Sequence, residues 1–332
     1  MTSTRNFIAP VTVLAAALLL SACERPPIDT EQVGYRGTAM VLVENPRAEQ
    51  NEITVPEPQP AASSGGPKAG AVYQNVQVLG DLNIAEFTRT MLAITQWVAP
   101  DEGCNYCHNP ADLADDSKYT KVVSRRMIQM TQHVNREWTD HHGGTGVTCY
   151  TCHAGNNVPE NIWFKDPSAD NMKAYTGNRE GQNIAAPNVG YASLPADPFS
   201  RYLEGESLDN IAVNTVGWQP TGDTGTIQKA EGTYALMFHL SSALGVNCNF
   251  CHNSRAFAEW DQSRPQRVTA WHGLRMVAGL NNEFLNPLQP VYPDYRLGPT
   301  GDAPKANCGT CHQGANKPLG GVNMVADYPA LQ

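Results

Sequence analysis

Apolar residues recur at three- and four-residue intervals in several stretches of the chain, which is the spacing of one face of an α-helix. Three stretches follow this pattern at Ile84, Phe87, Met91, Ile94 and Val98, at Tyr119, Val123, Met127, Met130 and Val134, and at Tyr234, Met237 and Leu244. A fourth helical stretch covers residues 264–280. The segments between them are loop-rich, and the chain holds 28 glycines and 24 prolines. The pattern predicts a mainly α protein.

A Cys-x-x-Cys-His motif recurs along the chain, at residues 104–108, 149–153, 248–252 and 308–312. The first two motifs begin 45 residues apart and the last two 60 residues apart. Repetition of one unit is typical of a modular array. We therefore expect two pseudo-repeated halves of two helix–motif units each, 81–156 and 231–332, joined by a polar connector over 157–230.

The N-terminus has the form of an export signal, with an apolar run and small residues just before a cysteine. We interpret 1–22 as a lipoprotein-type signal peptide, Cys23 as the lipid-anchored first mature residue, and 23–80 as an extended arm. The alternative is an uncleaved membrane helix. Its apolar run, 7–22, has 16 residues and contains Pro10, whereas a span needs roughly 20. Both interpretations place the folded part outside the cytoplasm.

The charge balance bears on the class of partner. The formal net charge is −9, and the 23 lysines and arginines are scattered along the chain. This distribution argues against a nucleic-acid-binding surface. An acidic surface suits a basic soluble partner, although ordinary solubility accounts for the same balance.

The repeated motif is the attachment pattern of haem c. Its two thiols bond to the porphyrin, and the histidine that follows becomes a ligand of the iron. Zinc sites, redox pairs and disulfides between neighbours use the same cysteines, but four motifs that each end in histidine, in an exported chain, favour haem. The eight cysteines are Cys104, Cys107, Cys149, Cys152, Cys248, Cys251, Cys308 and Cys311. Since the ninth is Cys23, we expect no disulfide between distant parts of the chain.

Each iron also needs axial ligands. The predicted proximal ligands are His108, His153, His252 and His312. The candidate sixth ligands on the helices before the first three motifs are Met91, Met127 and Met237. A thioether ligand raises the reduction potential, and core packing is the alternative role of any single methionine. Met130 competes with Met127.

The fourth motif departs from this pattern, because its preceding helix offers both a histidine and a methionine. Its candidates by position are His272, Met276, His141 and His142. Spacing alone leaves all four open.

Taken together, the motifs resemble the tetrahaem cytochrome c subunit of the purple-bacterial photosynthetic reaction centre, over nearly the whole chain from Cys23 onward. The resemblance implies four covalently bound haem c groups, three with a methionine as sixth ligand and one with two histidines. Met91, Met127 and Met237 match the three methionines by spacing to their motifs. His141 matches the second histidine of the fourth haem, with His142 as the fallback. Arg267 matches a residue at the interface with the photochemical subunits.

The resemblance further implies an electron-transfer subunit that performs no bond chemistry. A soluble c-type cytochrome or high-potential iron–sulfur protein would reduce the haems, which lie in the spatial order third, fourth, second, first. The third would reduce the photo-oxidised bacteriochlorophyll pair. The implied partners are the reaction-centre L and M subunits and the core antenna complex, on the periplasmic face of the photosynthetic membrane.

Two other functions compete with this interpretation. A multihaem reductase needs an iron with an open position, whereas here every iron has a candidate sixth ligand. A periplasmic carrier unrelated to photosynthesis would use the same chemistry with other partners, so only the family resemblance speaks against it.

Overall fold

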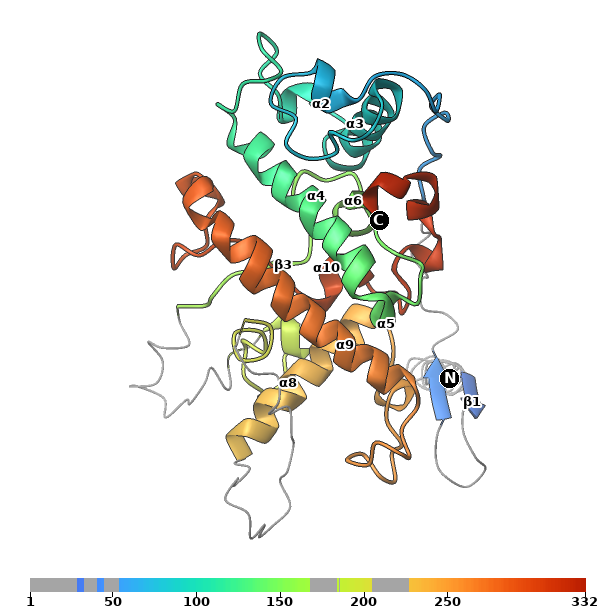
Figure 1. Ribbon diagram of the computed structural model, residues 1–332. Helices are drawn as coiled ribbons and strands as arrows, with labels where there is room; N and C mark the ends of the chain where they lie inside the picture. Colours follow the sequence, from blue (N-terminus) through green and yellow to red (C-terminus); the bar gives the residue numbers. More distant parts are fainter. Residues whose placement is uncertain (1–28, 33–40, 45–53, 168–183, 185, 205–226) are drawn as a thin grey trace, which may run out of the picture.

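The structure is a computed structural model that describes residues 29–32, 41–44, 54–167, 184, 186–204 and 227–332. It is rich in helices and loops and poor in sheet, which confirms the mainly α prediction (Figure 1). The α-helices are α2 (Ala69–Val72), α3 (Ile84–Val98), α4 (Tyr119–Glu137), α5 (Thr139–His142), α6 (Cys149–His153), α8 (Ile227–Leu244), α9 (Gln266–Gly279) and α10 (Cys308–His312). The strands are β1 (Asp29–Gln32), β2 (Val41–Glu44), β3 (Ile162–Trp163) and β4 (Lys305–Ala306).

Short helical turns connect these elements. The 3-10 turns are η1 (Gly103–Tyr106), η3 (Pro187–Val189), η4 (Cys248–Phe250), η6 (Asn286–Val291), η7 (Asp294–Arg296), η8 (Pro318–Gly321), η9 (Met324–Asp327) and η10 (Pro329–Leu331). A π-helical turn, η5 (Leu280–Leu285), continues α9. The four predicted helical stretches are the four long helices α3, α4, α8 and α9.

The start and the end of helix α3 are determined by residues close to them in the sequence. Asn83 caps its start, because its side chain accepts from the Glu86 amide while the Glu86 carboxylate accepts from the Asn83 amide. The helix ends at Val98, two residues before Pro100. Its inner face buries Trp97, whose ring meets Tyr328 edge-on at 4.8 Å between centroids. The start and end of α3 are therefore encoded locally.

Helix α8 departs from its predicted face. Leu236 is fully buried, whereas Tyr234, which the apolar spacing includes, is 53% exposed. The helix packs against η3 and α10, which lie far away in the sequence. The buried face is thus decided by distant elements that the spacing does not reveal.

The helices carrying the motifs form a continuous series of contacts. Helix α3 packs against α6, α6 against α10, and α10 against α8. Figure 1 shows α3 toward one end of the molecule and α8 toward the other, with α4, α6, α9 and α10 between them. The second and fourth motifs therefore meet in the middle.

The end of the chain returns to the first helices. The Arg89 guanidinium donates to the Asp327 carbonyl at 2.5 Å, and the Gln132 amide donates to the Ala330 carbonyl at 2.9 Å. Asn135 donates to the carbonyls of Val147 and Leu331. Residues 318–331 consequently cover a core cluster around Trp97 that includes Ala93, Ile128, Met324 and Leu331.

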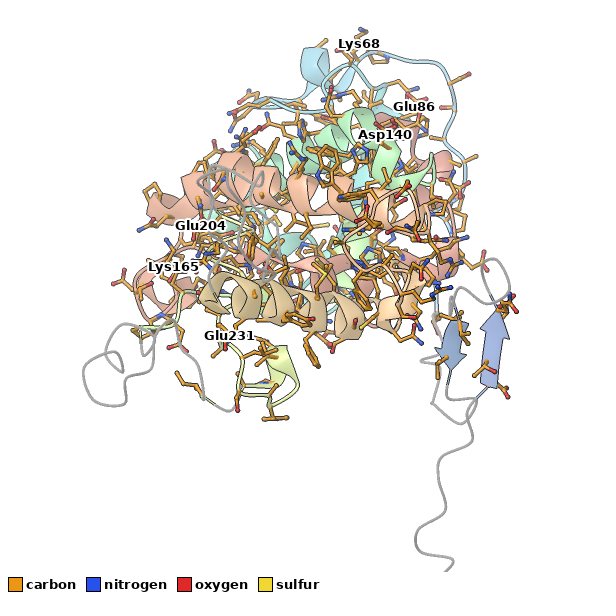
Figure 2. The ribbon with its side chains drawn as sticks, turned by 90° about the horizontal axis from the view of Figure 1, so that it is seen from below. Lys68, Glu86, Asp140, Lys165, Glu204 and Glu231 are labelled. Atoms are coloured by element: carbon orange, nitrogen blue, oxygen red, sulfur yellow. A yellow bond between two sulfur atoms is a disulfide. The ribbon has the colours of Figure 1, made fainter. Side chains whose placement is uncertain are left out.

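A second core cluster surrounds α9 and includes Trp163, Phe199, Leu203, Leu236 and Leu280. Asn281, which is fully buried, joins its parts, because its amide donates to the carbonyls of Leu203 at 2.8 Å and Ala306 at 3.0 Å and its oxygen accepts from the Ala306 amide at 2.8 Å. Nearby, Lys165 pairs with Glu204 at 3.0 Å (Figure 2). Residues 186–204 of the expected connector thereby belong to the folded core.

Parts of the predicted organisation lie outside the described residues. These are the signal peptide, Cys23, and the remainder of the arm and connector. The described end of the arm contacts the folded part, since the Gln59 amide donates to the Tyr328 hydroxyl at 2.8 Å. Within the ranges that the structure describes, we find no helix long and apolar enough to cross a membrane.

We predict that Asn281→Ala lowers the free energy of unfolding by about 1–3 kcal/mol for each buried backbone group that it leaves unpaired. Chemical denaturation followed by circular dichroism would measure this. Asn286→Ala is the matched control, because Asn286 makes one side-chain bond of 3.2 Å to Glu204. An equal loss in both variants would contradict the proposed role of Asn281.

Candidate haem-binding sites

A cavity of about 820 Å³ lies where the motifs converge. At least one cysteine of every motif lines it: Cys107, Cys149, Cys152, Cys251, Cys308 and Cys311. The imidazoles of His141, His153 and His312 and the side chains of Met127, Met130 and Met276 also line it. Met91 on α3 and Met237 on α8 are outside this lining, and so are the motif histidines His108 and His252. The cavity therefore gathers sulfur and imidazole groups from both ends of the sequence.

The second and fourth motifs form one turn of α-helix each, α6 and α10. In each, the amide of the cap residue donates to the hydroxyl of a threonine three positions later, Thr148 to Thr151 at 3.0 Å and Asn307 to Thr310 at 2.9 Å. The residue after each histidine adopts a left-handed conformation with φ 49°, which ends the helix. The chain then turns back, so that His153 Nδ1–H donates to the Asn156 carbonyl at 2.9 Å. His312 Nδ1–H donates to the Ala315 carbonyl at 2.9 Å in the same way.

The first and third motifs take a different form, because the first cysteine of each lies in a 3-10 turn, η1 or η4, and the second directly follows that turn. Here the loop after the histidine is longer. His108 Nδ1–H donates to the Leu113 carbonyl at 3.0 Å, and His252 Nδ1–H donates to the Phe257 carbonyl at 3.1 Å. Each acceptor is five residues after its histidine, compared with three in the other two motifs.

These bonds decide the protonation of the rings. A backbone carbonyl only accepts hydrogen bonds, so each Nδ1 carries a hydrogen, and in the neutral ring Nε2 then keeps its lone pair. That is the form in which imidazole binds a metal, with its other nitrogen held by a carbonyl. The four motif histidines therefore fit the proximal ligands of haem iron.

Burial favours the same neutral form. It lowers the pKa of His312 to about 4, and it also lowers the pKa values of His153 and His252. A metal-binding imidazole must be unprotonated on the ligating nitrogen. The buried rings are thus neutral across the physiological pH range.

The thiols are set in apolar surroundings. Burial raises the pKa of Cys149 to about 11 and that of Cys308 to about 12. Cys107 and Cys251, which are partly buried, have pKa values raised to about 11 by the same cause. Cys104 and Cys248 are exposed. The first cysteine is therefore exposed in the first and third motifs and buried in the second and fourth.

One pair of sulfurs differs from expectation. Cys152 and Cys311 are joined by a disulfide across 159 residues, whereas the sequence predicts no disulfide between distant parts of the chain. The physical reason is that α6 and α10 pack against each other, which brings the two Cα atoms to 4.3 Å. The expectation failed because the distance between the two motifs in space is not encoded in their spacing.

His141 and His142 are adjacent in α5 but have opposite tautomers. His141 Nδ1–H donates to the Thr269 carbonyl at 3.0 Å, so its Nε2 keeps a lone pair. Its ring lies 6.0 Å from that of His312, between centroids. His142 Nδ1 instead accepts from the amides of Gly144 and Gly146, at 3.2 and 3.0 Å. Its buried Nε2 must therefore carry the hydrogen, and it has no hydrogen-bond partner among the described residues.

The other two candidates near the fourth motif have neighbours of their own. His272 meets the Trp271 ring edge-on at 4.9 Å between centroids. Met276 is buried in the core cluster around α9, although it also reaches the cavity. Of the four candidates, His141 alone combines a lone pair on Nε2, by the hydrogen bonds given, with a place beside a motif histidine.

The three predicted methionines lie partly buried in the middle of α3, α4 and α8. Thr95 donates to the Met91 carbonyl at 2.8 Å, and Thr131 donates to the Met127 carbonyl at 2.9 Å, so the first two share a local setting. Met130 instead packs against the core cluster around α9. This shared setting favours Met127 over Met130 as the counterpart of Met91.

Arg267 holds the loop after the third motif. Its guanidinium donates to the carbonyl of Glu259 at 3.0 Å and to the Ser263 hydroxyl at 2.8 Å, and it stacks on the Trp260 ring at 4.0 Å. Burial lowers the pKa of Arg267 from its ordinary value. Trp260 is 51% exposed, so an aromatic surface lies next to this arginine.

Sequence reasoning missed the groups that orient the histidines. The acceptors are backbone carbonyls, which every residue has, so no sequence signal could have found them. Gly273 is a partial exception, because a Cβ at this position would lie 2.5 Å from His141 Cε1. A glycine in the middle of a helix is a signal of close approach by another group.

Comparison with known proteins identifies the family of the chain. Residues 24–332 match the family described as photosynthetic reaction centre cytochrome C subunit. The chain is 54% identical over 330 residues to the photosynthetic reaction center cytochrome c subunit of Rubrivivax gelatinosus, covering 98% of this chain and 89% of that one.

Two further relatives carry the same name. The protein of Thermochromatium tepidum is 47% identical, covering 100% of this chain and 82% of its own. The protein of Roseobacter denitrificans is 44% identical, covering 97% of this chain and 90% of its own. The motif histidines in their ligand form and the length of these matches lead to one conclusion: the chain belongs to the family of photosynthetic reaction centre cytochrome c subunits, which carry covalently bound haem c.

Proposed function

We propose that this electron-transfer subunit holds four haem c groups and passes electrons from a soluble carrier to the photo-oxidised bacteriochlorophyll pair. The observation that carries the proposal is a hydrogen bond that all four motif histidines share. Each donates Nδ1–H to a carbonyl of the loop that follows it, at 2.9–3.1 Å. When bound, haem c supplies a one-electron iron couple.

The proposed axial pairs follow from position and tautomer. They are His108 with Met91, His153 with Met127, His252 with Met237, and His312 with His141. The lone pair on His141 Nε2 and the 6.0 Å between its ring and that of His312 support the last pair. His142, whose Nε2 carries the hydrogen, is unsuited to this role in its neutral form.

The eight motif cysteines are proposed to bond to the porphyrins as thioethers. A sulfur bonded to a porphyrin carbon cannot also form a disulfide, so Cys152 and Cys311 would be separate in the haem-loaded chain. Their closeness supports neighbouring second and fourth haems.

Two pseudo-repeated halves are proposed as well, because equivalent contacts occur in both. The Gly155 amide donates to the Trp97 carbonyl at 2.9 Å, and the Gly314 amide donates to the Ala243 carbonyl at 2.8 Å. Each glycine is two residues after its motif histidine, and each acceptor is six residues after the proposed methionine ligand. One packing solution therefore serves α3 with α6 and α8 with α10.

The spatial order third, fourth, second, first is supported by the series of contacts α8, α10, α6, α3. The first and third motifs would then be at opposite ends. An electron would enter near the first motif and leave near the third, and the bis-histidine haem would lie between two haems with methionine ligands.

The partners are proposed from the family. The reaction-centre L and M subunits and the core antenna complex would lie on the membrane side, with a lipid on Cys23 as the anchor at the periplasmic face. Phe257, Trp260 and Trp271, which are exposed around Arg267, support a protein-binding surface beside the third motif. A soluble c-type cytochrome or high-potential iron–sulfur protein would dock at the other end.

The haem content tests the proposal directly. We predict four haems per chain by pyridine haemochrome assay against protein mass, with no free motif thiol and no disulfide. Electron paramagnetic resonance should show all four low-spin, three of one class and one of another. A five-coordinate, high-spin haem would instead indicate an open iron and a reductase.

Met237→His should lower the reduction potential of the third haem, because imidazole replaces the thioether that favours the ferrous state. We expect a shift larger than a tenfold change in the equilibrium constant, which is about 59 mV for one electron. Re-reduction of the pigment pair after a flash should slow. Met276→Leu is the control and should leave both readouts unchanged. Unchanged potentials in Met237→His would refute this ligand.

Gly273→Ala should displace His141, since the new Cβ would lie 2.5 Å from its Cε1. Alanine is the better helix former by about 1 kcal/mol, so the helix itself should remain intact. The bis-histidine signal in electron paramagnetic resonance should change while the other three stay. Gly279→Ala is the matched control on α9, because the nearest atom to its Cβ is 3.9 Å away. An unaltered bis-histidine signal in Gly273→Ala would refute the role of His141.

A further inference from the structure

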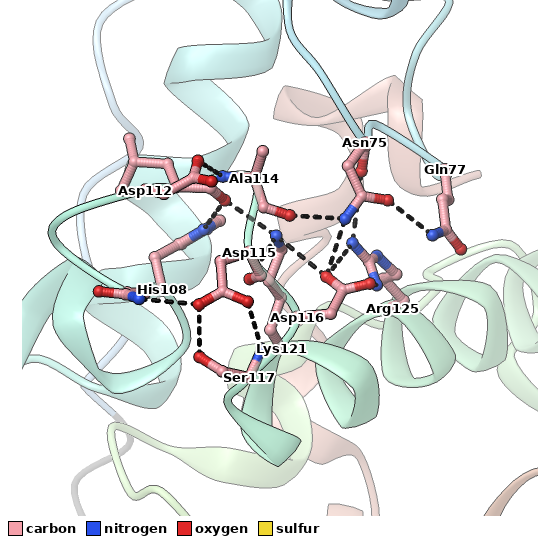
Figure 3. A network of polar contacts seen from close by, with 12 residues as sticks. Asn75, Gln77, His108, Asp112, Ala114, Asp115, Asp116, Ser117, Lys121 and Arg125 are labelled. Atoms are coloured by element: carbon pink, nitrogen blue, oxygen red, sulfur yellow. Dashed lines mark hydrogen bonds and ion pairs between the residues drawn. The ribbon is translucent and has the colours of Figure 1, made fainter.

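A buried lysine lies next to the first motif. Lys121, on the first turn of α4, is 6% exposed. Its ammonium donates to the carbonyls of Leu113 and Asp115, at 2.9 Å each, and it lies 3.1 Å from Asp116 Oδ1. Figure 3 shows Lys121, Asp115 and Asp116 around one loop. A lysine is rarely buried to this degree unless oxygen partners surround it, as they do here.

One of these partners also serves the motif histidine. The Leu113 carbonyl accepts from His108 Nδ1–H at 3.0 Å and from Lys121 Nζ at 2.9 Å. A single oxygen is therefore shared by an ammonium and by the imidazole that is the proposed iron ligand (Figure 3). Removal of the lysine would leave that oxygen to the imidazole alone.

We propose that Lys121 is a positioning residue that acts through His108 to raise the reduction potential of the haem at the first motif. The inference rests on the proposed role of His108 as proximal ligand. Nothing in the family pattern of cysteines, histidines and methionines includes this lysine.

Two effects have the same sign. A strong bond from Nδ1–H to a carbonyl makes the imidazole a better electron donor and favours the ferric iron. By taking part of the electron density of that carbonyl, the ammonium weakens this donation. In addition, a positive charge in a region of low dielectric favours the ferrous state, which has one less positive charge. Both effects raise the potential.

Other charged side chains lie close to Lys121. Arg125 donates to Asp116 at 2.8 and 2.9 Å, and its bonds hold the pKa of Asp116 well below its usual range. Asp115 accepts from Ser117 and Asn109, which lowers its pKa also. Both carboxylates are therefore ionised and oppose Lys121 and Arg125. Lys121 is the cation of this group that contacts the acceptor of His108.

At the third motif, the histidine and the arginine whose position is equivalent to that of Lys121 donate to different carbonyls. Arg267 is on the first turn of the helix after that motif, as Lys121 is on the helix after the first. Its guanidinium donates to the carbonyls of Ala258 and Glu259, at 3.3 and 3.0 Å, while Phe257 accepts from His252. The proposed first and third haems therefore differ in whether a cation contacts the acceptor of the proximal histidine, which would separate their potentials.

The test is a redox titration of the haem-loaded chain carrying Lys121→Gln. We expect the equilibrium constant for reduction of the first haem to fall about tenfold, or ~59 mV for one electron. Met91→His identifies the wave that belongs to this haem. Lys118→Gln is the matched control, because Lys118 is bonded to the Asn105 carbonyl within the same motif. It should cause a much smaller shift.

A second variant separates electrostatics from loosening of the loop. Asp116→Asn removes a negative charge near Lys121, so it should raise the same potential, whereas a loosened loop would move both variants in one direction. Opposite shifts support the proposal. Shifts of one sign, equal shifts in Lys121→Gln and Lys118→Gln, or no shift in Lys121→Gln would overturn it. All these outcomes leave haem content and low-spin state intact, so they are distinct from failure of the proposed ligands.

Discussion

The structure depends on one constraint: an imidazole binds iron only through a nitrogen that carries no hydrogen, so something must hold the hydrogen on the other nitrogen. Here a backbone carbonyl does this at each of the four motif histidines. The loop after each motif turns back, so that one of its carbonyls lies within hydrogen-bond distance of the histidine. In the second and fourth motifs a left-handed residue, Ala154 or Gln313, reverses the chain within three residues. In the first and third motifs, the accepting carbonyl is five residues after the histidine.

Packing of the motif helices against one another follows from the same loops. The glycines at positions 155 and 314 have φ values of 87° and 85°, and their amides bond to α3 and α8. The turn that orients the histidine therefore also attaches its motif to the helix of the neighbouring unit. As a result α6 and α10 are held together in the middle, between the ends that carry the first and third motifs.

Two buried lysines of this acidic protein have oxygen atoms as hydrogen-bond partners. Lys121 and Lys305 are both buried, and each contacts a carboxylate and at least one carbonyl. A fixed charge in the interior acts on its neighbours more strongly than a surface charge, which solvent and salt screen. The effect proposed for Lys121 on the potential of the first haem depends on this difference.

The sequence by itself determined what depends on local pattern. The helices α3, α4 and α9, the four motifs and the family were all readable, because a three- or four-residue spacing and a five-residue motif are contained in short segments. The mainly α class followed from the same spacing. The buried face of α8 was only partly readable, since distant segments cover it.

Only the tertiary structure decided the questions that spacing leaves open. His141 and His142 are adjacent and equivalent in sequence, but one meets the carbonyl of Thr269, 128 residues away, and the other meets two nearby glycine amides. Likewise, the closeness of Cys152 and Cys311 and the carbonyl shared by Lys121 and His108 arise when the chain folds. Hydrogen bonds to backbone groups and contacts between distant segments leave no residue pattern, because every residue has the same carbonyl and only the fold brings a particular one within reach.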